Sequence, residues 1–183
     1  MFKSIPHMLF NTIEKYPEND ALRFKSNGEN KSYTYTQFGE NIKKIMHGLA
    51  ATGLTKGDKI AILSNNRPEW TISDFAIFCL QGVVVPIYQT LPANQIEYIL
   101  NDAEIRAIFV ENLEQLGKIL EIKEKVPTLE FIFTFDKTEV TSPFISLYDH
   151  LVEKGEAHLK ENPDLMKQNM EAINSKDICS LVY

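Results

Sequence analysis

The stretch from residue 59 to residue 88 decides the fold, and it reads KIAILSNNRPEW (59–70), TISDFAIFCL (71–80) and QGVVVPIY (81–88). Ile60 to Leu63 form an apolar run without polar alternation, which is typical of a parallel strand covered on both faces. Pro68 predicts the first turn of a helix, because its missing N–H would have no partner there, and Asn65 or Asn66 is expected to satisfy nearby donors. The helix has almost no polar face and leads into a second strand, 83–87. The stretch therefore predicts a buried strand-helix-strand unit.

The chain before this unit predicts a helix, a hairpin and a second helix. Met8, Leu9, Ile13 and Tyr16 can share one helical face, and Pro17 ends that helix. The segments 21–25 and 31–35 flank an Asn-Gly pair, which favours a tight β-hairpin turn. Thr36 is the expected N-cap of the next helix, and Gly53 its stop. Most of the few glycines are expected at turns of this kind.

The chain after the unit continues the alternation of strands and helices. A helix is expected from Pro92 onward, a strand at 107–110, a helix carrying Leu113, Leu116, Ile119 and Leu120, and a strand at 131–135. This order predicts an α/β fold, with a mostly parallel, doubly wound sheet, flanking helices and the small N-terminal β-hairpin.

The pattern loosens between residues 136 and 175. Leu147 and Leu151 suggest a short helix there, and the segment 164–173 is expected to form a mobile, exposed helix on the surface. The last residues, DICSLVY (177–183), predict a mostly apolar strand. Because domains seldom finish on such a strand without a polar tail, we expect a truncated piece of a longer protein.

Composition excludes several classes of protein. A chain of 183 residues with 44% apolar content can bury one sizeable core. The formal charge of −6 argues against a nucleic-acid partner. The two cysteines lie in apolar runs, so we expect no disulfide and a reducing, cytoplasmic location. No run approaches the roughly 18 to 20 apolar residues of a membrane span.

Two polar segments follow strands of the predicted sheet, which is where ligands gather in open parallel sheets. The first contains Arg67, whose charge the helix dipole does not favour at a helix N-terminus. Our favoured interpretation is an ion pair with Glu69 or Asp74, and direct ligand contact is the alternative. The second contains Tyr88 and Thr90, which we interpret first as a polar turn and second as a ligand contact.

Other candidate residues carry weaker signals. Trp70 is expected in the core, with the alternative that its ring lines an apolar ligand channel. Pro86 suggests a strand end, a bulge or a sheet edge. The four histidines lack metal-ligand spacing, so structural or surface roles are expected and no metal site is predicted.

Several motifs together resemble the N-terminal region of AMP-forming acyl-CoA synthetases, and long-chain fatty acid–CoA ligases in particular. They are KSYTYTQF (31–38), GLTKGDKIAILSNNRPEW (53–70), GVVVPIYQTL (82–91), QIEYILNDA (95–103) and AIFVEN (107–112). The resemblance covers nearly the whole chain in order. The final DICSLVY (177–183) is similar to the strand that, in this family, precedes a Ser/Thr/Gly-rich phosphate-binding loop. Ala103 departs from the small hydroxyl residue that relatives often carry.

The resemblance implies a two-step reaction of the whole enzyme. A fatty carboxylate attacks the α-phosphate of ATP, with Mg²⁺, to give acyl-AMP and pyrophosphate, and coenzyme A then displaces AMP. The groups that catalyse these steps in the family lie outside residues 1–183, so no catalytic residue is carried over. Residues 1–183 are then expected to be an inactive N-terminal subdomain of the larger adenylate-forming domain, with no cofactor bound. Arg67, Trp70, Tyr88 and Thr90 remain as candidate positions in or behind a substrate pocket.

Two alternatives stay open. The chain could be a stand-alone α/β binding module, in which residues 178–183 pair with a partner or a second copy. It could also come from a ligase of the same superfamily that acts on another carboxylic acid. A homodimer and peripheral association with the inner membrane are likewise left open by the resemblance.

Overall fold

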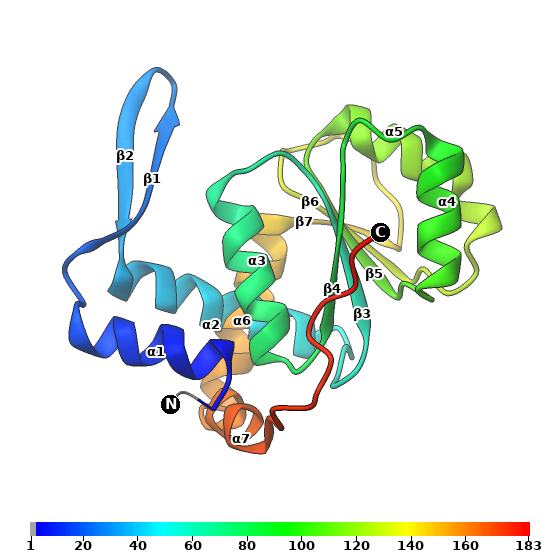
Figure 1. Ribbon diagram of the computed structural model, residues 1–183. Coiled ribbons are helices and arrows are strands. Elements are labelled where there is room, and N and C mark those ends of the chain that lie inside the picture. The colour runs from blue at the N-terminus through cyan, green and yellow to red at the C-terminus, as the bar shows by residue number, and fades with distance from the viewer. Residues whose placement is uncertain (1–2) are drawn as a thin grey trace.

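The computed structural model describes residues 3–183 and contains a five-stranded sheet in which all strands run parallel (Figure 1). The strand order is β4-β3-β5-β6-β7, and every neighbouring pair is parallel. The bounds are β3 (Lys59–Leu63), β4 (Val83–Ile87), β5 (Ala107–Val110), β6 (Phe131–Thr134) and β7 (Ile145–Leu147). The predicted doubly wound α/β fold is confirmed, and β7 is a strand that the sequence analysis did not anticipate.

Helices cover both faces of this sheet. On one face lie α4 (Ala93–Asp102) and α5 (Leu113–Ile122), followed by a short 3₁₀ turn, Lys123–Lys125. The other face carries α1 (Ile5–Lys15), α2 (Tyr35–Ala51), α3 (Pro68–Cys79), α6 (Tyr148–Glu161) and α7 (Leu165–Ala172). Alternate residues of β3 enter the two cores, Ile60 and Ile62 on one face and Ala61 and Leu63 on the other. A strand buried on both faces needs apolar residues at every position, which explains its uninterrupted run.

The hairpin forms as predicted, whereas two N-terminal details differ. Strands β1 (Asp20–Ser26) and β2 (Glu29–Thr34) project from the body of the protein (Figure 1). The turn that joins them is formed by Asn27 and Gly28, which both adopt positive φ. The N-cap of α2 is Thr34 rather than Thr36, because Thr34 forms a capping box with Gln37. The buried face of α1 is formed by Pro6 and Leu9, and Met8 and Tyr16 are exposed. In α5, Leu113 is exposed as well.

Residues 136–175 are more ordered than their charged sequence suggests. Helix α6 is long and packs directly on α2, and Met166 of α7 is buried against the same core. Gly48 and Gly155 lie where α2 and α6 cross. Together with Gly39 and Gly117, they make up the half of the glycines that lie inside helices rather than at turns. The helix expected at residues 164–173 is therefore present as α7 and is mostly exposed, although its Met166 side chain is buried, and the short helix expected around Leu147 and Leu151 is instead the 14-residue helix α6.

Two histidines join the same pair of helices. The Nδ1 atoms of His47 and His158 are 3.0 Å apart, and His47 is fully buried. Burial, with smaller contributions from the charges of His158 and Lys43, lowers the pKa of His47 to about 4. A neutral His47 can share one proton with His158 across the helix interface, which is a structural role.

The C-terminal segment is not a buried strand, which corrects the sequence-based expectation for residues 178–183. It meets the open edge of β4 at a single parallel bridge between Val84 and Ser180. The Val84 N–H donates to Cys179 O at 2.9 Å, and the Leu181 N–H donates to Val84 O at 3.0 Å. The next bond of such a ladder would need an N–H at residue 86, and Pro86 has none. The proline lies on an edge strand, as its sequence context suggested.

Candidate functional site

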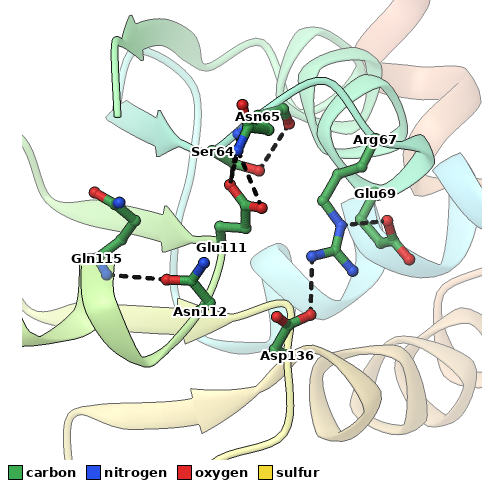
Figure 2. A network of polar contacts seen from close by, with 8 residues as sticks. All are labelled: Ser64, Asn65, Arg67, Glu69, Glu111, Asn112, Gln115 and Asp136. Atoms are coloured by element: carbon green, nitrogen blue, oxygen red, sulfur yellow. Dashed lines mark hydrogen bonds and ion pairs between the residues drawn. The ribbon is translucent and has the colours of Figure 1, made fainter. Parts of the chain in front are cut away.

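Polar loops follow β3, β4, β5 and β6 at one edge of the sheet. The carboxyl ends of parallel strands meet at the same edge, so Asn65, Gln89, Glu111 and Asp136 are brought together from distant parts of the sequence. Figure 2 shows Asn65 with Glu111, and Arg67 with Glu69 and Asp136. The loop of residues 64–67 is thus tied to the loops after β5 and β6.

A pocket of about 500 Å³ opens between the ends of β3 and β4 and the C-terminal segment. Its apolar wall comes from Trp70, Pro86, Ile87 and Val182, with the rings of Tyr88 and Tyr183. Its polar wall comes from Ser64, Asn65, Asn66, Gln89 and Thr90. Every one of these side chains is uncharged at neutral pH. The arrangement suits an uncharged ligand part that has both apolar surface and hydrogen-bonding groups.

Three of the four candidate residues lie in this pocket. Trp70 is half-buried: it packs against the core, as expected, and it also lines the pocket. Tyr88 is 75% exposed, and Thr90 is exposed in a turn in which the Leu91 N–H donates to Tyr88 O. The turn predicted for residues 88–90 is therefore present, and it also forms the rim of the pocket.

Arg67 turns away from the pocket and forms ion pairs. Its guanidinium donates to Glu69 at 2.7 Å and to Asp136 at 2.9 Å, and it lies over the ring of Phe135 (Figure 2). Burial alone would lower the pKa of Arg67, but the two carboxylates outweigh it and the pKa is raised. The predicted pair with Glu69 is present, and Asp136 takes the place expected for Asp74. Arg67 is the N-cap residue of α3 without a side-chain capping bond, and Asn65 does not cap this helix either.

Asn65 is instead the centre of a second set of hydrogen bonds. Its backbone N–H and its side-chain amide both donate to the Glu111 carboxylate, at 2.7 Å and 3.0 Å. Its side-chain oxygen accepts a hydrogen bond from the Gln89 amide. Lys118 of α5 donates in turn to the backbone oxygen of Gln89. The loops after β4, β3 and β5 are therefore joined in one chain of contacts.

Sequence reasoning included Gln89 only as part of the polar turn at residues 88–90, and it missed Glu111 and Asp136 as parts of this site. A usable signal was present, because each residue lies within two positions of the end of a strand, and each strand end was predicted within one residue. The pairing between them was not readable, since the partners lie 24 to 69 residues apart.

The pocket does not fit the charged cofactors that the family resemblance implies. A triphosphate needs cationic or backbone N–H donors, and Mg²⁺ needs carboxylate or phosphate oxygens, whereas the pocket walls are uncharged. Within residues 3–183, no group of three or more His, Cys, Asp or Glu side chains is placed to hold a metal ion. In the same described residues, no helix has both the length and the apolarity to cross a bilayer.

Comparison with known families identifies the chain's membership. The family described as AMP-binding enzyme matches residues 9–183. This chain belongs to the AMP-binding enzyme family. The AMP-binding chain covers only part of its relatives, about a quarter of the length of the curated proteins that it matches.

Three curated relatives show how this AMP-binding chain aligns. It is 28% identical to the long-chain-fatty-acid–CoA ligase ACSBG1 of Bos taurus, over 99% of the chain and 25% of that protein. It is 32% identical to fatty acyl-CoA synthetase A of Dictyostelium discoideum, over 85% of the chain and 23% of that protein. It is 29% identical to the long-chain-fatty-acid–CoA ligase FadD15 of Mycobacterium tuberculosis, over 82% of the chain and 24% of that protein.

A solved structure shares the fold. The anthranilate CoA ligase AuaEII, in complex with anthranoyl-AMP, superposes with a TM-score of 0.74 at 23% identity, over 96% of this chain and 31% of that one. At this identity the likeness supports the shared architecture of the AMP-binding chain and leaves the substrate undetermined.

Proposed function

We propose that residues 1–183 form the N-terminal part of a long-chain fatty acid–CoA ligase. The whole enzyme would activate a fatty carboxylate with ATP to acyl-AMP and pyrophosphate, and then transfer the acyl group to coenzyme A with release of AMP. The observation that carries this proposal is the similarity of 82–99% of the chain to fatty acid–CoA ligases of animals, a slime mould and a bacterium. The uncharged pocket is consistent with it, because an acyl chain is one of the uncharged parts of the substrates.

The proposed contribution of this part is a scaffold and a wall of the acyl pocket. Trp70, Tyr88 and Thr90 would face the acyl chain, and Arg67 would brace the loop that carries Asn66. The charged cofactors, ATP, Mg²⁺ and coenzyme A, would bind to other parts of the protein. Residues 1–183 alone are then expected to be inactive.

The first test compares the complete protein with the 183-residue chain. The parental reading frame is expected to continue beyond Tyr183 with a Ser/Thr/Gly-rich loop followed by lysine. With palmitate, the complete protein should catalyse ATP–pyrophosphate exchange, and the isolated chain should show none above background. Circular dichroism would establish that the isolated chain is folded in the same preparation.

Each outcome of this test has a defined meaning. Exchange by the 183-residue chain, or a reading frame without that loop, would contradict the proposal. Exchange by the complete protein with benzoate or acetate but not palmitate would instead support a ligase for another acid. A stop codon after Tyr183 together with a stable dimer in sedimentation would favour a stand-alone binding module.

A second test concerns the wall of the pocket. In the complete ligase, Trp70→Leu should raise KM for palmitate about tenfold, because it removes part of an aromatic wall whose burial contributes about 1.5 kcal/mol or more. KM for ATP should stay within about twofold. Tyr98→Leu is the matched control, since Tyr98 is 64% exposed on α4 and outside this pocket. Equal changes in both KM values would argue against the assignment of Trp70.

A further inference from the structure

We infer that Glu111 is a positioning residue that sets the shape of the uncharged pocket without lining it. Its carboxylate holds Asn65, and through Asn65 it places Gln89, so that both loops of the polar wall depend on one side chain. The inference deepens the proposed function and depends on it for the identity of the ligand.

The contacts of Glu111 hold the main chain and the side chain of Asn65 together. The backbone N–H of Asn65 donates to one carboxylate oxygen at 2.7 Å, and the side-chain amide donates to both oxygens, at 3.0 Å and 3.3 Å (Figure 2). Hydrogen bonds to an ionised carboxylate are about twice as strong as neutral ones. Glu111 is itself anchored, because its own N–H donates to Leu63 O at 3.1 Å. The loop after β3 is therefore fixed to the end of β5.

The same contacts decide which way the Asn65 amide faces. Its nitrogen must point to Glu111, since a carboxylate only accepts, and its oxygen then faces Gln89. Gln89 can donate to that oxygen only in this orientation. Lys118 adds a hydrogen bond to the Gln89 backbone oxygen, and its ammonium remains outside the pocket lining. The Glu111 carboxylate thus orients the Asn65 amide, and the Asn65 amide orients that of Gln89.

The loop of residues 64–67 has a second anchor, so loss of Glu111 should disturb the loop without unfolding the protein. The loop of residues 64–67 is also held at Arg67, which pairs with Glu69 and Asp136. Removal of Glu111 should leave this anchor intact, and the apolar residues of β3 and β5, which are fully buried in the parent, should keep the sheet in place. We therefore expect a folded protein in which Asn65 and Gln89 lose their fixed positions.

The experiment uses three variants and two independent readouts. Glu111→Ala removes the acceptor, Glu111→Gln keeps one acceptor oxygen without the charge, and Glu121→Ala is the control, from the exposed side of α5. In the 183-residue chain, acrylamide quenching of Trp70 reports on the pocket directly, because Trp70 is the single tryptophan. In the complete ligase, KM for palmitate, KM for ATP and kcat are measured separately.

The expected pattern is selective. Glu111→Ala should at least double the quenching constant of Trp70 and raise KM for palmitate about tenfold, as expected for the loss of a charged hydrogen-bond partner. KM for ATP and kcat should change less than about twofold. In Glu111→Gln, the quenching constant and KM for palmitate should stay close to the values of the parent. Glu121→Ala should match the parent.

Other outcomes overturn the inference or the proposed function separately. Unchanged quenching in Glu111→Ala, a fall in kcat at constant KM for palmitate, or equal changes in both KM values would overturn the role of Glu111. A complete protein that does not activate palmitate would overturn the proposed function. In that case the quenching result alone still decides whether Glu111 positions the pocket.

Discussion

Gly155→Ala is expected to lower the free energy of unfolding by at least about 4 kcal/mol, or to prevent folding at 37 °C. A Cβ at this position would lie 1.8 Å from the Lys44 backbone oxygen and 2.9 Å from the Gly48 backbone nitrogen. Both atoms belong to α2 and cannot rotate away, so the two helices would have to separate. Helix propensity alone would favour alanine by about 1 kcal/mol. The steric clash must therefore cost more than the predicted net loss of stability. Urea unfolding followed by circular dichroism measures the change.

A matched glycine supplies the control. Gly117 lies in α5, and a Cβ there would meet no atom within 4 Å. Gly117→Ala should therefore raise the free energy of unfolding by about 0.5 to 1 kcal/mol. Gly48→Ala should resemble Gly155→Ala, because its Cβ would lie 2.3 Å from the Leu151 backbone oxygen. A Gly155→Ala protein within 1 kcal/mol of the parent would show that the helices are not in backbone contact.

Asp74→Asn is expected to stabilise the protein at pH 8 and to have little effect at pH 4. Burial raises the pKa of Asp74 from 3.8 to about 7. The folded state therefore holds this proton more tightly than the unfolded state, and stability falls as the pH rises from about 4 to 7. A shift of this size corresponds to at most about 4 kcal/mol above pH 7. The carboxyl is half-buried, so solvent screening reduces the expected gain to about 2 kcal/mol.

Thermal unfolding at several pH values tests this prediction. At pH 8, Asp74→Asn should raise Tm by about 4 to 8 °C, and the difference should disappear as the pH approaches 4. Glu121→Gln is the control, because Glu121 is exposed on α5. A gain that is the same at both pH values would mean that the carboxyl charge is not its cause.

The elements of the sheet were largely predictable because their signals are local. Uninterrupted apolar runs predicted β3, β4 and β5 within one residue, and proline and glycine marked the ends of helices. The signal failed where a segment is short or charged. β7 has three residues, too few for a pattern, and the charged residues along α6 hid the length of a helix that was expected to be short.

The site was predictable only in part, for a related reason. The rule that ligands gather at the carboxyl ends of strands selected Tyr88 and Thr90, which lie in one pocket with Trp70. It also selected Arg67, whose carboxylate partners turn it elsewhere. Of the two partners expected for Arg67, Glu69 forms the ion pair and Asp74 does not, and the second carboxylate comes from Asp136, in a loop 69 residues away. Sequence spacing along one helix cannot reveal such a competitor.

The amino-acid sequence by itself determined the class of fold, the order of its strands and helices and the family to which the chain belongs. Those properties follow from apolar periodicity, from turn residues and from motif order, all of which act over a few neighbouring residues. Tertiary structure alone decided that Glu111 orders Asn65 and Gln89, that Gly48 and Gly155 bring α2 and α6 into backbone contact, and that Pro86 limits the C-terminal pairing to one bridge. Each of these depends on groups that meet only after the chain has folded, because a hydrogen bond or a steric clash requires two atoms in one place.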